Sequence, residues 1–364
     1  MKVCHVTSAH LPFDGRIFER ECSSLAKYYN VYLIVPNTRE CERNGVNVKG
    51  VTIPQSRIKR IIHLKSIFSK MQEIDADVYH IHEPELIPYA LRMKRKRKKI
   101  IFDSHEDIPA TILRMSYIPS FLRGSLSNFY TFFEKWALRK FDAVVSVTPD
   151  IVNRLKKINP HTYMLTNYPI NEVKGDEREW ERKVVFAGAV SYNWNFNSIL
   201  KAIENLDVSL ELIGPSNEDY LDSLKSQPGW GKVHYYGQIK HQDVLSILKK
   251  CTVGLALESY DNPNAGGKKG SIGVTKIFEY MKEGIPVIAT DLENWVPIVE
   301  GTESGYCINP KDIQSLREKI EYLLNNRGEA KRLGDNGRKA VKEKYCWQTQ
   351  EKTLFEMYEK VLAE

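Results

Sequence analysis

Short apolar runs alternate with amphipathic helical stretches along the chain, and this alternation limits the possible folds more than any other feature. Each run has the length of a strand, and helical spacing of apolar residues follows it. In the first half the runs are residues 2–7, 31–36, 77–82, 99–104 and 142–148, with 46–53 as a further strand or hairpin arm. Helices are expected over 16–29, 57–73, 84–96 and 149–158, with one long aromatic helix ending near Lys140. This order predicts a parallel, doubly wound sheet.

The alternation starts again after TNYP (166–169) and a polar stretch (170–182). Strands are expected over 183–190, 208–214, 233–237, 252–258 and 285–290, and the chain is almost entirely helical from Asp312. The sequence therefore predicts an α/β protein of two Rossmann-like domains, residues 1–168 and 169–346, with a terminal segment 347–364. Ligands bind at the carboxyl ends of strands in such sheets, and two domains facing one another form a cleft.

Composition excludes several classes of protein. Apolar residues make up 42% and charged residues 27% of the 364, which argues against disorder and fibrous repeats. No apolar stretch reaches the roughly 18–20 residues of a membrane-spanning helix, and no signal peptide is expected. The six cysteines are scattered without a Cys-x-x-Cys pair, so the chain is expected to be reduced and cytoplasmic.

Positive charge is concentrated in the first half. Residues 1–170 contain 27 Lys and Arg against 16 Asp and Glu, a net charge of +11, whereas the remainder has a net charge of −4. The asymmetry suggests an anionic partner: a membrane surface, a nucleic acid or a phosphorylated acceptor. Two basic stretches, 57–71 and 121–140, interleave apolar side chains, which suits a membrane surface, although apolar residues at helical spacing are more often core. We expect peripheral binding at the inner face of the cell membrane and no nucleic-acid partner.

The segment AHLPFDGRIFERE (9–21) leads from the first strand into a helix. A helix N-terminus beside a glycine can bind an anion, which makes Asp14, Gly15 and Arg16 candidates. No Gly-x-Gly-x-x-Gly is present, so the standard dinucleotide fingerprint is absent. The alternative is an ordinary turn in which Asp14 caps the helix.

Histidines form a second candidate group. His80 and His82 are two residues apart on one strand, so their side chains point to the same face. His105 directly follows the end of the strand 99–104. Residues of this group that could ligate a metal ion are His82, Glu83, His105, Glu106 and Asp107. Their spacing matches no zincin or phosphoesterase pattern, so packed, hydrogen-bonded histidines are favoured. The Asp-Ala-Asp segment (75–77) lies at the wrong edge of the sheet.

The glycine- and lysine-rich stretch 261–290 is the third candidate. Lys268 and Lys269 precede a helix that is expected to start near Gly273, and Lys276 and Glu279 share a face of that helix. Lysines and helix N–H groups suit a diphosphate, and a carboxylate suits sugar or ribose hydroxyls. A solvated loop with a surface ion pair remains the alternative.

The ordered set of motifs resembles the family 4 glycosyltransferases with the GT-B fold. VTKIFEYMKEGIPVIATD looks like the nucleotide-sugar signature of that family, and HVTSAHLPFDGRIFERECSSLAK, DVYHIHEPEL, IFDSHED, TNYP and FAGAV follow in the family's order. The resemblance implies retaining, metal-free transfer from a UDP- or GDP-sugar. It also implies that the second domain holds the donor, the first holds the acceptor, and a closing helix near 348–363 crosses back to the first domain.

The resemblance assigns roles to single residues. It implies that Glu279 binds the nucleotide ribose and that His105 meets the donor sugar, and both are taken as catalytic. The expected donor-binding residues are Gly15, Gly188, Lys268, Lys269, Ser271, Gly273, Lys276 and Glu279. The expected acceptor-binding residues are Asp14, Arg16, His82 and Glu106.

The sequence departs from the family pattern in two places. Ser271 stands where the family often has the first of two glutamates, and FAGAVSYNWNFN lacks the arginine often found after the first strand of the second domain. Lys268, Lys269 or Lys276 is expected to meet the diphosphate instead.

The expected acceptor is a glycan, carried on a lipid in surface-polysaccharide synthesis. The alternatives are a sugar-nucleotide 2-epimerase of similar architecture and a non-enzymatic basic protein that binds membranes or nucleic acid.

Overall fold

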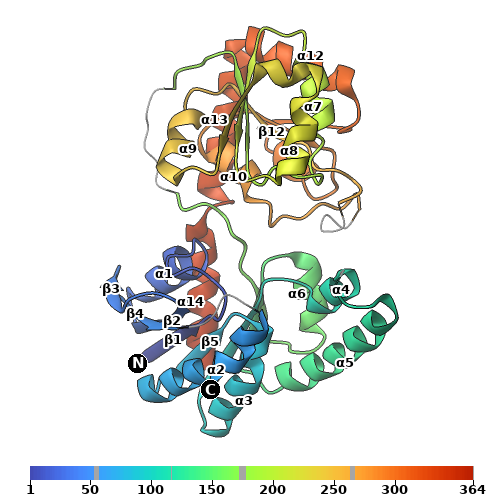
Figure 1. The fold of residues 1–364 in the computed structure, drawn as a ribbon. Helices are drawn as coiled ribbons and strands as arrows, with labels where there is room; N and C mark the ends of the chain where they lie inside the picture. Colours follow the sequence, from blue (N-terminus) through green and yellow to red (C-terminus); the bar gives the residue numbers. More distant parts are fainter. Residues whose placement is uncertain (53–56, 116, 172–177, 263–266, 364) are drawn as a thin grey trace. The chain divides into compact units, whose positions relative to one another are not determined.

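The computed structural model describes residues 1–52, 57–115, 117–171, 178–262 and 267–363, with the side chains of 57–63 outside the described part. The chain forms two compact units (Figure 1). Unit 1 comprises Met1–Asn167 and Gln350–Glu364, and unit 2 comprises Tyr168–Thr349. The boundaries expected from the sequence were residues 168 and 346.

Unit 1 is built on an eight-stranded sheet of order β3-β4-β2-β1-β5-β6-β7-β8. All neighbouring strands are parallel except β3, which pairs antiparallel with β4 at the edge. The strands are β1 (Lys2–Val6), β2 (Asn30–Pro36), β3 (Cys41–Arg43), β4 (Val46–Val51), β5 (Val78–Ile81), β6 (Lys99–Ser104), β7 (Ala143–Ser146) and β8 (Thr162–Met164).

Helices connect and cover the strands of unit 1. A π-helical segment (Ile17–Cys22) continues into α1 (Ser23–Leu25), and a 3-10 turn (Pro84–Leu86) precedes α3. The other helices are α2 (Arg57–Ile74), α3 (Ile87–Arg95), α4 (Ile108–Arg114), α5 (Ser120–Leu138), α6 (Pro149–Lys156) and α14 (Trp347–Ala363).

Unit 2 holds a six-stranded, entirely parallel sheet of order β11-β10-β9-β12-β13-β14. Its strands are β9 (Lys183–Ala187), β10 (Ser209–Ile213), β11 (Val233–Gly237), β12 (Val253–Ala256), β13 (Val287–Thr290) and β14 (Gly305–Ile308). Its helices are α7 (Phe196–Ile203), α8 (Glu218–Lys225), α9 (His241–Leu248), α10 (Thr275–Lys282), α11 (Val296–Val299), α12 (Ile313–Asn325) and α13 (Arg327–Glu343), with a 3-10 segment Pro228–Lys232.

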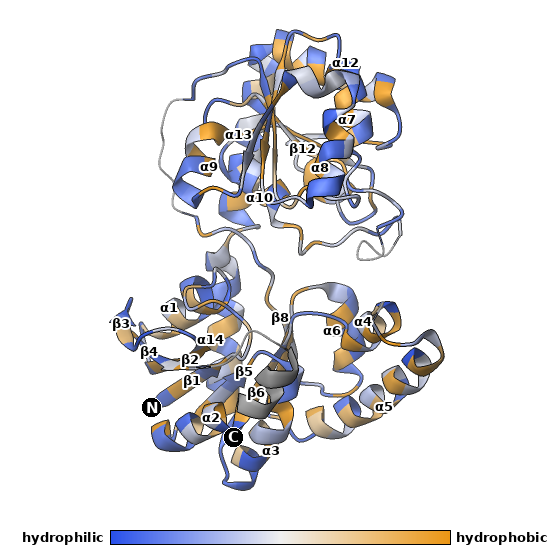
Figure 2. Cartoon of the chain, in the orientation of Figure 1, coloured by the Kyte–Doolittle hydropathy of each residue, from blue (hydrophilic) through white to orange (hydrophobic). Residues whose placement is uncertain are grey.

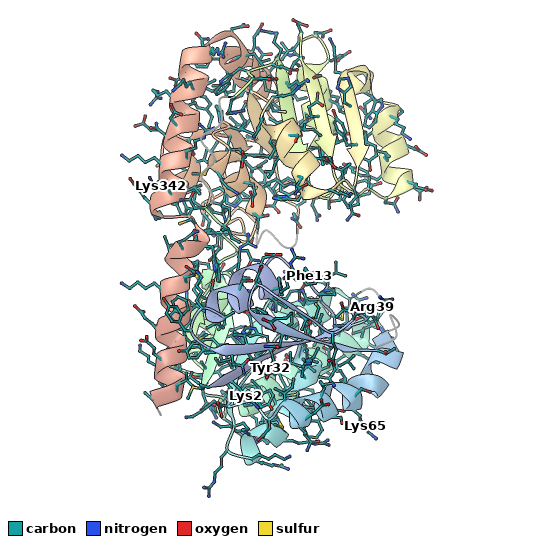
Figure 3. The ribbon with its side chains drawn as sticks, turned by 90° about the vertical axis from the view of Figure 1, so that its left-hand side faces the viewer. Lys2, Phe13, Tyr32, Arg39, Lys65 and Lys342 are labelled. Atoms are coloured by element: carbon teal, nitrogen blue, oxygen red, sulfur yellow. The ribbon has the colours of Figure 1, made fainter. Side chains whose placement is uncertain are left out.

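Successive side chains of the central strands enter two separate cores. On β9, Val184 and Phe186 pack on one face of the sheet, and Val185 packs on the other. Because side chains alternate across a strand, a strand buried on both faces is largely apolar, as the orange parts of the strands in Figure 2 show. Charged side chains such as Lys2, Lys65 and Lys342 point outward (Figure 3).

The structure confirms the predicted fold class and corrects the expected elements in two respects. The single aromatic helix expected to end near Lys140 is two helices, α4 and α5, because the chain turns at residues 117–118 and Pro119 precedes α5. Strands β8 and β14 are short, and the sequence pattern did not indicate them. Among the described helices, none combines the length and apolar character that a bilayer-spanning segment requires.

Helix α14 joins unit 1 through buried polar contacts. The Tyr358 hydroxyl lies 3.0 Å from Nδ1 of His80 and 3.1 Å from Nε2 of His5. His5 and His80 lie opposite each other on the paired strands β1 and β5. The last helix of the chain is therefore tied to the centre of the first sheet.

Candidate functional site

In unit 1, the carboxyl ends of β1, β5 and β6 gather three of the segments singled out in the sequence. The three strands are neighbours in the sheet, so the loop 7–15, the pair His82–Glu83 and the segment 103–107 follow at one edge. Glu83 fixes the loop after β1: its carboxylate accepts hydrogen bonds from Oγ1 of Thr7 (2.5 Å) and the amide of Ser8 (2.8 Å). Burial raises the pKa of Glu83.

Asp14 occupies the capping position that the sequence offered as an alternative. Its carboxylate accepts from the amides of Arg16 (2.8 Å) and Ile17 (2.9 Å), and it lies 3.3 Å from Nδ1 of His10. Burial opposes ionisation, but these hydrogen bonds outweigh it and lower the pKa of Asp14. Gly15 is exposed in the same turn.

Arg16 has an internal position. Its side chain is 5% exposed, and its guanidinium contacts Asp103 (2.8 Å), the carbonyl of Leu165 (2.7 Å) and Asn167 (2.6 Å). These contacts join the loop after β1 to β6 and to the end of unit 1. Most of its donors are therefore directed into the unit, and a role of Arg16 in acceptor binding stays a prediction.

A chain of histidines runs from the edge of the sheet into its centre. Nε2 of His105 lies 3.2 Å from Nδ1 of His82, and Nε2 of His82 lies 3.0 Å from Nδ1 of His5. Asp103 lies 3.3 Å from His105 and 3.4 Å from His82. Burial lowers the pKa of His82 to about 4. His105 is the partly exposed member of the chain and so the one that a ligand can contact. Exposed Glu106 contacts Thr111.

Two groups of described residues have the proximity of metal ligands: His5 with Glu21, His80 and His82, and His82 with Asp103 and His105. In both groups, ring nitrogens contact one another, Tyr358 or Asp103 at hydrogen-bond distance. Nε2 of His80 and both carboxylate oxygens of Glu21 are buried without a hydrogen-bond partner among the described residues, so the absence of a metal ion stays a prediction.

Unit 2 places Lys276 at the carboxyl end of β9. The side chain is 8% exposed, and Nζ lies 3.4 Å from the ring centroid of Phe186 and 3.3 Å from that of Trp194. Nζ has no hydrogen-bond partner among the described residues. A Cβ at Gly188 would lie 2.9 Å from Nζ, so only glycine leaves this space open, and its φ of +144° is also in the range that favours glycine.

Contacts of Tyr280 fix the position of helix α10, which carries Lys276. Tyr280 packs its buried ring against Gly254 of β12, where a Cβ would lie 2.5 Å from the ring, and its hydroxyl accepts from the amide of Ala187 (2.8 Å). The surface ion pair considered for Lys276 and Glu279 is therefore wrong, because Lys276 points into the unit and is unpaired.

Two carboxylates near Lys276 each have an oxygen without a partner. Burial raises the pKa of Glu258, just after β12, to about 6, and its Oε2 makes no hydrogen bond within the part of the chain that the structure describes. Glu279 lies one turn into α10, as expected, and its Oε2 is buried without a partner. Burial lowers the pKa of Lys276. The carboxyl edge of the unit 2 sheet therefore has two carboxylate oxygens without partners among the described residues, near the buried amine of Lys276.

The loop before α10 is held by its backbone. The carbonyls of Lys268 and Lys269 accept from the amides of Glu293 and Asn294 (both 2.8 Å), and both lysine side chains are exposed. Oγ of Ser271 accepts from the amide of Gly273 (3.1 Å), so these two expected donor residues contact each other. Residues 263–266 of this stretch lie outside the described residues.

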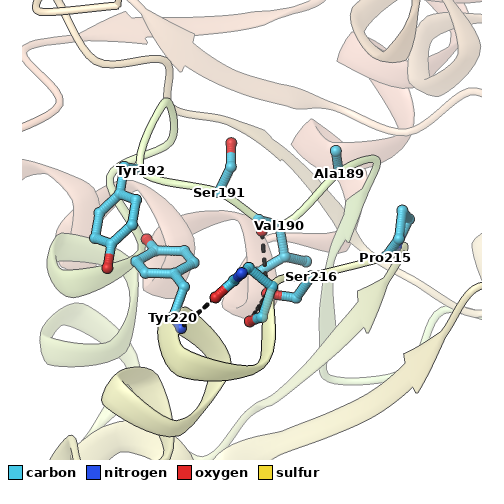
Figure 4. A pocket seen from close by; sticks show the side chains of 8 residues that line it. Ala189, Val190, Ser191, Tyr192, Pro215, Ser216 and Tyr220 are labelled. Carbon is cyan, nitrogen blue, oxygen red and sulfur yellow. Dashed lines mark hydrogen bonds between the residues drawn. The ribbon is translucent and has the colours of Figure 1, made fainter. Parts of the chain in front are cut away.

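A pocket of about 300 Å³ lies beside Gly188 at the same edge (Figure 4). Its lining comes from the segments after β9 and β10: Ala189, Val190, Ser191, Tyr192, Pro215, Ser216, Asn217 and Tyr220. The rings of Tyr192 and Tyr220 lie 3.9 Å apart. The sequence analysis named Gly188 but missed Tyr220, because only the pairing of β9 with β10 brings the two segments together.

Two family models match the chain: glycosyl transferases group 1 over residues 168–340, and glycosyltransferase family 4 over residues 16–163. The chain belongs to the family 4 glycosyltransferases. Anabaena HepE in complex with UDP and glucose superposes with a TM-score of 0.72 at 13% identity, over 99% of both chains. The likeness confirms the GT-B fold of this family 4 member.

Curated relatives agree with the family. An uncharacterised glycosyltransferase of Methanocaldococcus jannaschii is 24% identical over 62% of this chain and 61% of its own length. The phosphatidyl-myo-inositol mannosyltransferase of Mycobacterium leprae is 28% identical over 43% of this chain and 38% of its own. The chain thus spans about three fifths or less of the length of these relatives.

Replacing Lys276 with methionine is expected to stabilise the ligand-free protein. Methionine fills similar space without a buried amine that lacks a partner, a group that costs about 1–3 kcal/mol. In a unit of this size, each kcal/mol corresponds to about 2–4 °C in Tm. Because the pKa of Lys276 is lowered on folding, the unfolded state binds the extra proton, and the gain is expected to shrink as pH rises toward 10.5.

Thermal melts of Lys276→Met across pH check this, with Lys282→Met on the same helix as the matched control. A Lys276→Met variant that melts below the parent at neutral pH would contradict the dry, unpaired ammonium.

Proposed function

We propose that this protein transfers a sugar from a UDP- or GDP-sugar to a glycan acceptor. The observation that carries the proposal is the unpartnered ammonium of Lys276 beside Gly188, at the sheet edge where α/β proteins bind nucleotides. An ammonium group in dry surroundings binds an anion more strongly than one in water. A diphosphate is the anion that fits a family 4 glycosyltransferase.

Lys276 supplies the cation that the segment after β9 lacks. The family often has arginine there, and residues 186–197 of this chain contain none. Lys276 reaches the same strand end from α10, across the space left by Gly188. Exposed Lys268 and Lys269 add charge from the loop before α10. We therefore propose donor binding and leaving-group stabilisation without a metal ion.

Glu279 is proposed to hold the nucleotide ribose. Its free Oε2 is available one turn into α10, three residues after Lys276. A carboxylate accepts hydrogen bonds from two vicinal hydroxyls, and charge makes these bonds stronger. Lys276 and Glu279 then define the diphosphate and ribose positions of one nucleotide.

His105 is proposed to position the donor sugar. It is the exposed end of the histidine chain, and Asp103 and His82 fix its ring. In the proposed retaining reaction, the bond between the anomeric carbon and the diphosphate oxygen breaks, and the acceptor oxygen bonds to the same face of that carbon. The acceptor proton passes to the departing phosphate, so no protein nucleophile is required.

The relatives support the choice of donor and acceptor. HepE was solved with UDP and glucose, which supports a UDP-sugar. The Mycobacterium leprae relative is named for transfer of mannose to a phosphatidylinositol lipid, which supports a lipid-linked acceptor. We propose a lipid-linked glycan of a surface polysaccharide.

Calorimetric titration of Glu279→Ala and Ser271→Ala with UDP and GDP tests the donor site. Losing the Glu279 carboxylate is expected to weaken free nucleotide binding by roughly 1.5–3 kcal/mol, as for hydrogen bonds to a charged group. Ser271→Ala is expected to leave free nucleotide affinity unchanged and to alter selection among sugar conjugates. Parent-like nucleotide affinity in Glu279→Ala would place the donor elsewhere.

His105→Ala is expected to reduce turnover at least tenfold, about 1.4 kcal/mol of barrier, with the fold intact. Nucleotide release is measured with the UDP- or GDP-sugar that most raises Tm in a thermal-shift screen. Exposed His161 provides the control variant His161→Ala. Near-normal activity of His105→Ala would remove this residue from the site. The assay is run in the presence of EDTA, and a requirement for added Mg²⁺ would contradict metal-free transfer.

A further inference from the structure

One face of helix α5 carries a set of exposed apolar side chains, here called the α5 face. Phe121, Phe132 and Phe129 are 79%, 73% and 68% exposed, and neighbouring α4 and its following turn add Leu113 and Tyr117. Figure 2 shows orange segments along α4 and α5 at the outside of unit 1. The residues of the α5 face are Phe121, Leu122, Leu126, Phe129, Phe132 and Trp136.

The α5 face is separate from the packed side of the helix. Its residues recur every three or four positions, whereas Ser127, Glu134, Ala137 and Leu138 are buried on the opposite side. Leu122, Leu126, Phe129 and Trp136 recur at the helical spacing that is more typical of core residues, but all four are exposed. Phe133, at the same spacing, packs partly against the core. Contiguous exposed aromatic side chains of this kind mark a binding surface.

Positive charge borders the α5 face. Lys135, Arg139 and Lys140 are exposed at its C-terminal end, and Nζ of Lys140 lies 3.6 Å from the ring centroid of Trp136. Glu134 is the one acidic residue in the α5 sequence, and it is buried and paired with Arg154. No carboxylate of α5 therefore opposes an anionic partner here.

The second basic stretch of the sequence, 57–71, is a weaker candidate. Nζ of Lys70 lies 2.9 Å from Glu73 and 3.4 Å from Glu40, so its charge is neutralised locally. The side chains of 57–63 lie outside the described residues. Of the two basic stretches, α5 is therefore the better candidate for binding the anionic partner that the charge of the first half suggests.

We propose that the α5 face docks unit 1 on an anionic lipid bilayer. Phenylalanine and tryptophan rings enter the interfacial region of a bilayer, and lysine and arginine beside them contact lipid phosphates. Asp107 accepts from the amide of Ala110 at the start of α4, two residues after His105. The same segment that carries the docking helices therefore carries the proposed sugar-positioning histidine. That the α5 face brings the enzyme to a lipid-linked acceptor rests on the proposed function, whereas the docking itself does not.

Vesicle co-sedimentation tests the docking without donor or acceptor. The intact chain is mixed at low salt with vesicles of phosphatidylcholine alone or with phosphatidylglycerol. We expect binding to the anionic vesicles, at least tenfold weaker binding for Phe129→Ser/Phe132→Ser, and a similar loss for Lys135→Gln/Arg139→Gln/Lys140→Gln. Brominated lipid is expected to quench the tryptophan fluorescence of the parent more than that of Trp136→Phe.

Matched controls separate the α5 face from general effects. Tyr322→Ser removes a half-exposed aromatic ring of unit 2, and Lys225→Gln/Lys311→Gln/Lys331→Gln removes the same charge from unit 2; both are expected to bind like the parent. Equal recovery of the parent with neutral and anionic vesicles, or parent-like binding of both α5 variants, would overturn the proposal. So would a change in oligomeric state by Phe129→Ser/Phe132→Ser without a change in vesicle binding. Failure of the transfer assay alone would leave the docking result intact.

Discussion

Parallel strand pairing is the constraint on which both candidate regions of this protein depend. Neighbouring parallel strands end at one edge, so segments far apart in the sequence meet there. In unit 1 this brings Glu83 against the loop after β1 and His105 against His82. In unit 2 it brings Gly188, Lys276 and Glu258 to one edge of a fully parallel sheet. The antiparallel strand β3 lies at the edge of its sheet, three strands from β1.

The buried ammonium of Lys276 is a second constraint, and it opposes stability. An amine between two aromatic rings without a hydrogen-bond partner is unfavourable in the ligand-free fold. Tyr280 and Gly254 hold α10 in place, and Phe186 and Trp194 exclude water from Nζ. A diphosphate would supply the missing negative charge in surroundings where electrostatic attraction is strong. The burial of Lys276 thus both destabilises the free protein and strengthens the binding of a diphosphate.

Sequence patterns predicted the parts of the structure that depend on local order. The alternation of strands and helices placed both sheets, and the spacing of α10 placed Glu279 one turn from its start. The environment of Lys276 could not be predicted, because Phe186 and Trp194 surround it only after β9 pairs within the sheet. The contact of His5 with Tyr358 spans nearly the whole chain. Strand β14 was missed because four residues of mixed polarity give no periodic signal.

Proton uptake on nucleotide binding tests the central claim most directly. UDP is titrated calorimetrically at pH 8 in buffers of different ionisation enthalpy, where its terminal phosphate, with a pKa of about 6, is already ionised. Because burial lowers the pKa of Lys276 and a bound diphosphate raises it again, the parent is expected to take up protons as UDP binds. Lys276→Met is expected to bind more weakly and without that uptake. Binding of UDP to the parent without proton uptake, or equal uptake by Lys276→Met, would contradict the account.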